Sequence, residues 1–491
     1  MISICMIIAI LLPVLGGIGT LVFPFSNRKM MCVYVEMIAV VTSLIVLYIL
    51  LESNGETVTL FSFTRELHIS LRLDAVGKVF TVIVSFLWPF STLYSFEYMK
   101  HEGHERSFYM FYLMTYGVTL GIAMAENIVA MYFFYEMLTM VTIPLVIHTL
   151  TKEAVNATRT YMYYSLGGAA FAFIGMIFIL MYGTTSSFVP GGVLDMALVG
   201  DNKNLILFIY VICFCGFSVK AAMFPFSGWL PKAGVAPTPV TALLHAVAVV
   251  KAGAFACIRV TYFCFGCDVL KGTWAQNLLL LIVSFTIVYG CSRALKETHF
   301  KRRLAWSTVS NLSYILFGAL LMSPWGLMGA LMHMVCHALM KISSFFCAGA
   351  VICKSDRHFV HELDGIGRKM PKTMIIYTIS SLALMGVPGL PGFVSKWNLA
   401  KGAVSSQSVM GNIGLAALLI SALLTAIYML TVSVRAFFPG KAFDYTTLDG
   451  IKDPTWQMLV PLVTFTVLMF LIGLHPDFLS GPIQSVVNQV F

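Results

Sequence analysis

Residues 1–23, MISICMIIAILLPVLGGIGTLVF, form an apolar segment without a charged side chain. A helix needs roughly 20 mostly apolar residues to cross the hydrocarbon core of a bilayer, so this segment predicts a membrane span. It lacks the basic n-region and the small-residue cleavage site of a signal peptide. We therefore interpret it as a retained first helix.

Similar segments recur along the whole chain of 491 residues, which is 59% hydrophobic and only 11% charged, with a mean hydropathy of +0.87. No segment is left for a soluble domain. The sequence predicts an all-α integral membrane protein with about fourteen spans. These are expected near 1–23, 30–51, 74–95, 107–125, 127–150, 160–183, 203–223, 238–262, 274–294, 303–322, 325–353, 372–395, 409–438 and 456–475.

The distribution of Lys and Arg predicts the orientation. An even number of spans puts both termini on one side, and about twenty of the 31 basic residues then fall in loops on the opposite side. The terminus side holds Arg65, Arg72, Lys78, Lys203, Lys271 and Lys401. By the positive-inside rule both termini face outward from the cell (plasma) membrane. The net charge of +9 is scattered over short loops, which argues against binding of nucleic acid.

The other basic residues lie inside predicted spans, where a charge costs at least ~2.5–3.5 kcal/mol and therefore indicates function. Lys220 and Lys251 lie far from the nearest span ends. Among the acids, Glu136 lies deepest, and a structural ion pair is the alternative reading for it. Glu36 and Arg259 lie closer to span ends, where a long side chain can reach the interface.

The eleventh predicted span contains LMHMVCHALMKISSFF, with His333, His337 and Lys341 at i, i+4 and i+8. At 3.6 residues per turn these three drift by only about 80°, so they form a polar stripe. Histidine titrates near neutral pH, and the stripe therefore predicts a proton relay. His245 lies six residues before Lys251 and hence on another helix face, and its role stays open.

Two predicted spans are interrupted by Pro and Gly, in FSVKAAMFPFSGWLPKAG (217–234) and in SLALMGVPGLPGFVSKW (381–397). Each interruption lies beside a lysine, Lys220 or Lys396. If spans 4–8 and 9–13 are two five-helix units, the broken helix is the fourth of each, a pattern typical of inverted-repeat transporters. Proline kinks that serve packing alone are the alternative. The predicted domains are 1–105, 106–262 (first repeat), 263–440 (second repeat) and 441–491.

These segments carry a resemblance to a known family. FFYEMLTMVTIPL, KAAMFPFSGWLPKAGVAPTPVTALLHAVAVVKAG, FKRRLAWSTVSNLSYILFG, HALMKISSFF and MGVPGLPGFVSKW resemble the antiporter-like membrane subunits of respiratory complex I, Mrp-type Na⁺/H⁺ antiporters, and membrane-bound hydrogenases and formate hydrogenlyases. The resemblance covers nearly the whole chain. It implies fourteen helices with two inverted five-helix repeats.

The resemblance also implies roles for residues. Glu136 pairs with Lys220, while Lys251 and Lys396 complete a central axis. The eleventh-helix positions correspond to His333, His337 and Lys341. Two departures stand out: Ser227 replaces a histidine that many members have, and the long lateral helix of some members is not expected after the last span.

Three functions remain open from the sequence. The first is a proton-translocating, or Na⁺/H⁺-exchanging, membrane subunit of a redox complex, with Fe–S or hydrogenase subunits as partners. The second is a subunit of a cation/H⁺ antiporter without a redox partner, and the third is a non-conducting spacer. We expect no cofactor, because the chain has no paired CxxC motifs, no GxGxxG and no P-loop. Cys264 and Cys267 form a single CxxC, which is weak evidence for a metal.

Overall fold

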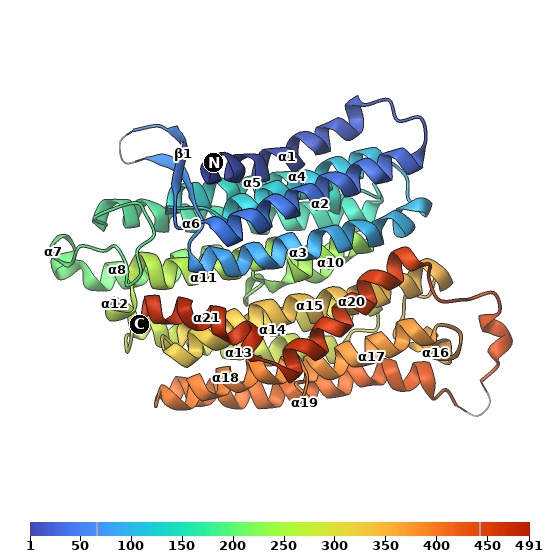
Figure 1. Ribbon diagram of the computed structural model, residues 1–491. Helices are drawn as coiled ribbons and strands as arrows, with labels where there is room; N and C mark the ends of the chain where they lie inside the picture. Colours follow the sequence, from blue (N-terminus) through green and yellow to red (C-terminus); the bar gives the residue numbers. More distant parts are fainter. Residues whose placement is uncertain (65–66, 441–442) are drawn as a thin grey trace.

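The computed structural model describes residues 1–64, 67–440 and 443–491, and its long helices run side by side through the molecule (Figure 1). Arg65 lies outside the described residues. Within them, eleven helical segments are long and apolar enough to cross a membrane. They are α1 (Ile2–Val22), α2 (Arg28–Glu52), α3 with η1 (Ala75–His101), α5 (Ile128–Val146), α6 (Lys152–Tyr182), α7 to α8 (Met196–Ser218), α10 to η5 (Thr238–Phe265), α13 (Trp274–Lys296), α15 (Pro324–Ser355), α19 (Val409–Phe437) and α20 (Trp456–Leu474).

Three further helical segments occupy the positions of the other predicted spans. They are α4 (Glu105–Ala123), α14 (Phe300–Leu320) and the pair α17 (Pro371–Met385) and α18 (Pro391–Ser405). The shorter elements are α9 (Trp229–Lys232), α12 (Cys267–Leu270), α16 (Ile366–Lys369), α21 (Asp477–Val490), and the 3₁₀ turns η2 (Gly200–Asn202), η3 (Phe226–Gly228), η4 (Ala233–Val235), η6 (Val360–Leu363) and η7 (Tyr445–Leu448). The described structure is therefore helical apart from one hairpin, β1 (Thr57–Ser62) and β2 (His68–Arg72).

Most long helices begin at a residue whose side chain caps the first turn. The cap oxygen accepts a hydrogen bond from the backbone N–H three residues later, which satisfies a donor that has no partner within the helix. Such caps are Asn27, Asp74, Asn127, Thr151, Thr273, Ser323 and Ser408. The polar residues between the apolar segments thus define the helix starts.

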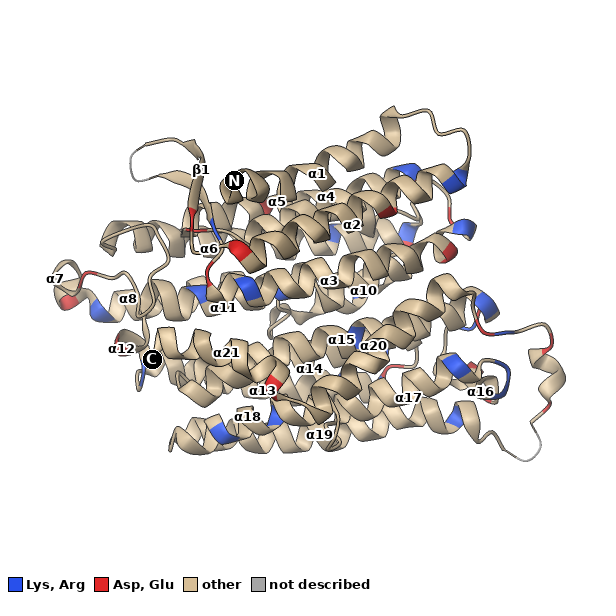
Figure 2. Ribbon diagram, in the orientation of Figure 1, with Lys and Arg blue, Asp and Glu red and all other residues tan. Residues whose placement is uncertain are grey.

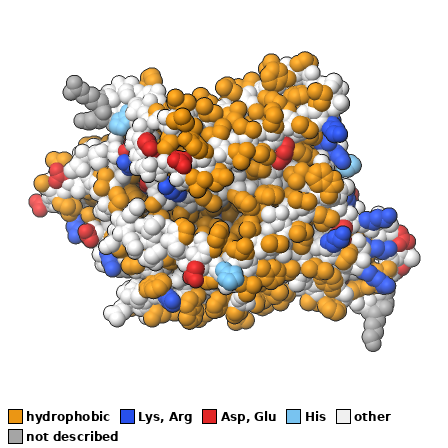
Figure 3. Space-filling view, viewed as in Figure 1, with side chains coloured by type: hydrophobic (Ala, Val, Ile, Leu, Met, Phe, Trp, Pro, Cys, Tyr) orange, Lys and Arg blue, Asp and Glu red, His pale blue; other side chains and the backbone are white. Residues whose placement is uncertain are grey.

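Charged side chains gather at the two ends of the helices, and a broad apolar belt covers the surface between them (Figures 2 and 3). The end that carries α16 is rich in Lys and Arg, whereas both termini lie toward the opposite end (Figures 1 and 2). This arrangement has the charge asymmetry that the sequence predicts, and it supports a membrane location.

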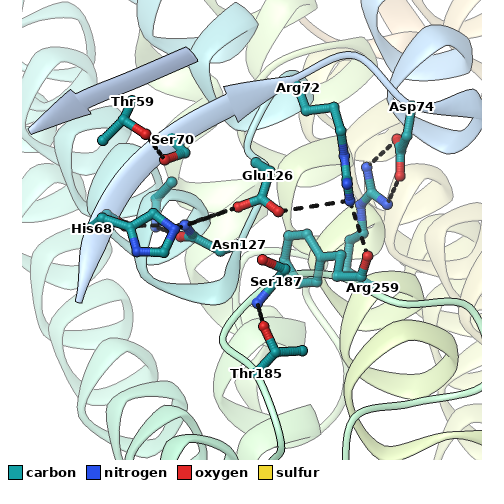
Figure 4. Close-up of polar contacts among 12 residues, drawn as sticks. Thr59, His68, Ser70, Arg72, Asp74, Glu126, Asn127, Thr185, Ser187 and Arg259 are labelled. Atoms are coloured by element: carbon teal, nitrogen blue, oxygen red, sulfur yellow. Dashed lines mark hydrogen bonds and ion pairs between the residues drawn. The ribbon is translucent and has the colours of Figure 1, made fainter. Parts of the chain in front are cut away.

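A cluster of charged side chains, drawn in Figure 4, connects the β1–β2 hairpin to the helices. Glu126 lies 3.9 Å from His68 Nε2 and 3.8 Å from Arg72 Nη2. Next to this cluster, Asp74 at the start of α3 forms an ion pair with Arg259 at the end of α11 (Val249–Arg259). Arg259 is fully buried, and its charge is matched by this carboxylate, which is 23% exposed.

Three boundaries differ from the prediction. The eighth predicted span is also broken, because α10 (Thr238–Ala246) and α11 are separated by Val247 and Ala248, whose backbone leaves the helical conformation. The twelfth was predicted to end at 395, yet helix resumes after the break and continues through α18. Beyond α20 the chain forms a further short helix, α21, after the last predicted span.

Candidate functional site

The first interrupted helix places a lysine inside the protein. α8 (Lys203–Ser218) ends just before Lys220, which is 1% exposed. Its ammonium group donates a hydrogen bond to the backbone carbonyl of Tyr135 on α5 and lies 3.4 Å from the centroid of the Tyr135 ring. A carbonyl oxygen and the negative face of an aromatic ring both stabilise a cation.

Glu136 follows Tyr135 directly, so α5 brings the acid next to the lysine's contact. Among the described residues, Glu136 forms no ion pair, and its Oε1 is buried without a hydrogen-bond partner. The side chain as a whole is only half-buried. Glu136 and Lys220, the predicted pair, are thus close to each other but form no ion pair. The carboxylate of Glu136 can still accept a further hydrogen bond.

The break between α10 and α11 sets Lys251 at the start of a new helix that packs against the first break. Gly253 makes this close approach possible, because a Cβ there would lie 2.6 Å from the backbone nitrogen of Ala221 and 2.9 Å from the carbonyl carbon of Lys220. Lys220 and Lys251 therefore belong to adjoining backbone segments at the centre of the first half.

A series of buried polar contacts leads from Lys251 into the second half. Lys251 Nζ lies 2.8 Å from His337 Nδ1. The rings of His337 and His333 are 5.7 Å apart between centroids, and His333 Nδ1 lies 2.9 Å from Ser395 Oγ. Lys251, His337, His333 and Ser395 have no exposed surface.

The second interrupted helix supplies the end of this series. Gly386 and Gly389 turn the chain with φ of 95° and 85°, angles that favour glycine. Lys396 on α18 reaches back across the break to the carbonyls of Leu384 and Met385, at 2.7 and 3.0 Å. Its ammonium lies 5.2 Å from the ring centroid of Tyr314.

Tyr314 connects this lysine to the histidines, because its ring centroid is 5.1 Å from that of His333. Its hydroxyl lies 2.6 Å from Ser421 Oγ on α19. Lys396 and His333 therefore both contact one buried aromatic ring.

Lys341 belongs to a branch of hydroxyl groups. Its ammonium donates to Ser307 Oγ at 2.7 Å and to the carbonyl of Leu304 at 3.2 Å. Tyr428 OH donates to the same Ser307 at 2.7 Å and lies 3.1 Å from Thr425 Oγ1. The branch thus runs from α15 through α14 to α19.

These hydroxyl partners were not predicted from the sequence. Ser307, Ser310 and Tyr314 recur at three- and four-residue spacing and so share one face of α14. That signal is present in FKRRLAWSTVSNLSYILFG. Serine and tyrosine are common in membrane helices, however. The pattern alone therefore does not show that Lys341 is the lysine in contact with this face.

His245 and the cysteine pair Cys264 and Cys267 do not take part in the contacts between Lys251 and Lys396. Both ring nitrogens of His245 lack a hydrogen-bond partner among the described residues, and its ring lies 4.8 Å from that of Phe345. Cys264 and Cys267 are free thiols, and no metal-binding group of three or more His, Cys, Asp or Glu residues occurs in the described chain.

Residues 125–429 match the model described as "NADH:quinone oxidoreductase/Mrp antiporter, TM". This range contains all three helix interruptions described above and Lys220, Lys251, Lys341 and Lys396. The chain belongs to this family. It is thus an antiporter-like membrane subunit, as the sequence motifs suggested.

Similar proteins agree with this assignment over the full length. NAD(P)H-quinone oxidoreductase chain 4 of Adiantum capillus-veneris, a chloroplast protein, is 25% identical over 95% of this chain and 94% of its own. A chain of the Mrp complex from Dietzia sp. DQ12-45-1b has a TM-score of 0.85 at 19% identity, covering 100% of this chain and 97% of that one. A chain of the membrane-bound sulfane sulfur reductase, an archaeal respiratory membrane complex, has a TM-score of 0.84 at 21% identity and covers 99% and 98%. This antiporter-like chain therefore has their fold.

Proposed function

We propose that this chain translocates protons as a membrane subunit of a multisubunit ion-pumping redox complex, such as a relative of complex I or of a membrane-bound hydrogenase. The observation that carries the proposal is a series of polar contacts that begins at the fully buried Lys251, His337 and His333 and reaches the half-buried Lys396 through the ring of Tyr314. Burying several cations costs free energy, so their presence favours a functional role. A non-conducting spacer leaves that cost unexplained.

Glu136 is proposed as the group that controls loading of Lys220. An opposite charge nearby stabilises a charged lysine, so approach of the carboxylate favours a proton on Lys220. Because Glu136 is only half-buried and its Oε1 is unpartnered, it is free to turn toward a neighbouring subunit. Lys220 then releases its proton toward Lys251 and the histidines, and Lys396 exchanges it with one membrane face.

The test replaces each group without changing its size much. Glu136→Gln or Lys220→Met is expected to abolish proton translocation by the purified complex in proteoliposomes, measured with a pH-sensitive dye, while subunit composition stays intact. Lys203→Met is the matched control, because Lys203 begins α8, the helix that leads to Lys220, but is exposed. Full coupling in either test variant refutes the scheme.

The proposed topology has fourteen spans, with inverted repeats at 106–262 and 263–440 between an N-terminal unit (1–105) and a C-terminal span (441–491). Both termini lie at the end of the molecule opposite the basic loops, which supports an outward orientation in the plasma membrane. A reporter enzyme active only outside the cytoplasm should work when fused after Phe491. Activity only of a cytoplasmic reporter at that position contradicts the orientation.

The partners distinguish the proposal from its alternative, a subunit of an Mrp-type monovalent cation/H⁺ antiporter. Purification of the native complex should recover Fe–S or hydrogenase subunits in the first case. Recovery of small antiporter subunits alone favours the second. Parallel translocation assays with and without Na⁺ decide whether the sodium ion also moves.

A further inference from the structure

A cavity of about 740 Å³ opens beside the start of α14, away from the buried lysine series. Its wall comes from the first turns of α6 and α14, the segment around α9 and η4, and the loop that follows α15. The charged and titratable residues that line it are Lys152, Glu153, Lys232, His299, Lys301, Arg302 and His358. Four of these are cations and one is an acid, so the cavity has a marked positive potential.

The start of α14 directs hydrogen-bond donors toward this cavity. The first N–H groups of a helix have no partner within the helix, and its dipole favours an anion there. The cap residue His299 makes no capping bond. The N–H of Phe300 donates to the carbonyl of His358 at 2.8 Å, and the N–H of His299 donates to Glu297 Oε1 at 3.2 Å. Among the described residues, the amides of Lys301 and Arg302 are left as open donors.

Two side-chain nitrogens at the same place also lack a hydrogen-bond partner within the described part of the chain. They are His299 Nδ1 and Arg302 Nε, both buried as atoms. Arg302 Nε has only a long ion pair, 3.9 Å from Glu297 Oε1. Buried polar atoms are usually hydrogen-bonded, so these unpartnered nitrogens are the strongest sign of a missing ligand.

His299 keeps a neutral ring available in this surrounding. It lies in the loop before α14, where burial, assisted by the positive charges of Arg302 and Lys301, lowers its pKa to about 4. A neutral imidazole can donate one hydrogen bond without adding another repelling charge to its neighbours.

We propose that this cavity binds a phosphate group, and that the ligand is the headgroup of an anionic phospholipid such as phosphatidylglycerol. Phosphate oxygens match the donors present, because arginine and helix amides both bind them well. The cavity also lies at the end of membrane helices where basic loops gather, the position at which basic pockets hold lipid headgroups. Pro231, Ala157 and Val235 supply an apolar part of the wall.

The test uses the purified complex and native mass spectrometry with added phosphatidylglycerol or phosphatidylcholine. The wild type is expected to bind phosphatidylglycerol more tightly, and Lys152→Gln/Arg302→Gln is expected to weaken this binding by roughly tenfold or more, from the loss of two surface cations. Lys152 is exposed and Arg302 is 42% exposed, so the double variant should fold. Lys29→Gln removes an exposed charge elsewhere and should leave binding unchanged.

Competition with inorganic phosphate separates the two sources of the group. Displacement of the lipid only at much higher phosphate concentration supports a headgroup site, whereas phosphate that binds in place of any lipid shows that the site takes the free anion. Equal affinity of the two lipids, or unchanged binding in the double variant, overturns the proposal. Proton translocation plays no part in this readout.

Discussion

At the scale of single residues, Ser307 is the hydroxyl on which the Lys341 branch depends. It accepts hydrogen bonds from both Lys341 and Tyr428. Ser307→Ala leaves the ammonium with the Leu304 carbonyl alone, and losing a partner of a buried charged group costs about 1–3 kcal/mol. We expect a lower midpoint of thermal unfolding and slower proton translocation.

Ser292→Ala is the matched control for this change. Ser292 donates only to Val288 in its own helix α13, so its replacement should affect neither measurement. If Ser307→Ala unfolds at the same temperature as the wild type, the hydroxyl does not stabilise Lys341.

The sequence could name the buried lysines and histidines because ionisable residues are rare inside apolar segments. It could not name their contacts. The hydrogen bond between Lys251 and His337 joins residues 86 positions apart. Lys396 was a candidate, but the sequence does not show that the break places its ammonium group against carbonyls at the end of α17. The pairing of Arg259 with Asp74 was not predictable for the same reason, since the two residues lie 185 positions apart.

At the scale of elements, the interrupted helices depend on glycines at which no other residue fits. A Cβ on Gly392 would lie 1.8 Å from the backbone oxygen of Ala383. Gly392→Ala must therefore push α18 away from α17, with an overpacking cost of about 1–3 kcal/mol. We expect a lower unfolding temperature. We also expect impaired proton translocation, because Lys396 is part of α18 and moves with it.

Gly167→Ala provides the control, because no atom lies within 4 Å of the added methyl group. There the substitution should stabilise α6 slightly, by roughly 0.5–1 kcal/mol. Equal unfolding temperatures for the Gly392 and Gly167 variants would show that the break tolerates a side chain.

The two proline- and glycine-rich breaks were predictable, whereas the third was not. The segment HAVAVVKAG around Val247 and Ala248 has no proline at the break and reads as continuous helix. The interruption coincides with the close contact of Gly253 on the Lys220 segment. Tertiary packing, which has no periodic signal in the sequence, thus decides this boundary.

At the scale of the whole molecule, the ion pair of Asp74 and Arg259 joins the start of α3 to the end of α11. Arg259→Met leaves a carboxylate without its partner, and breaking a buried pair from one side costs about 3–5 kcal/mol. Arg159→Met, at an exposed position of α6, should be neutral. Unfolding in denaturant measures both changes.

The pair also has a defined pH window. Burial alone raises the pKa of Asp74, but the charge and hydrogen bonds of Arg259 bring it below its usual 3.8. The stabilisation is therefore complete above pH 3.8 and is lost as the pH falls through the folded-state pKa. Arg259→Met should remove this acid-dependent part, and a variant that keeps it contradicts the assignment.

The buried stripe of α15 lies near the middle of a long helix. α15 has 32 residues, about 48 Å at 1.5 Å each, and His333, His337 and Lys341 occupy its central part. A proton held there has crossed about half of the membrane voltage, worth about 1.2 kcal/mol per 100 mV. Uptake and release should then each be electrogenic, and an applied potential should slow or speed both half-steps to a similar degree.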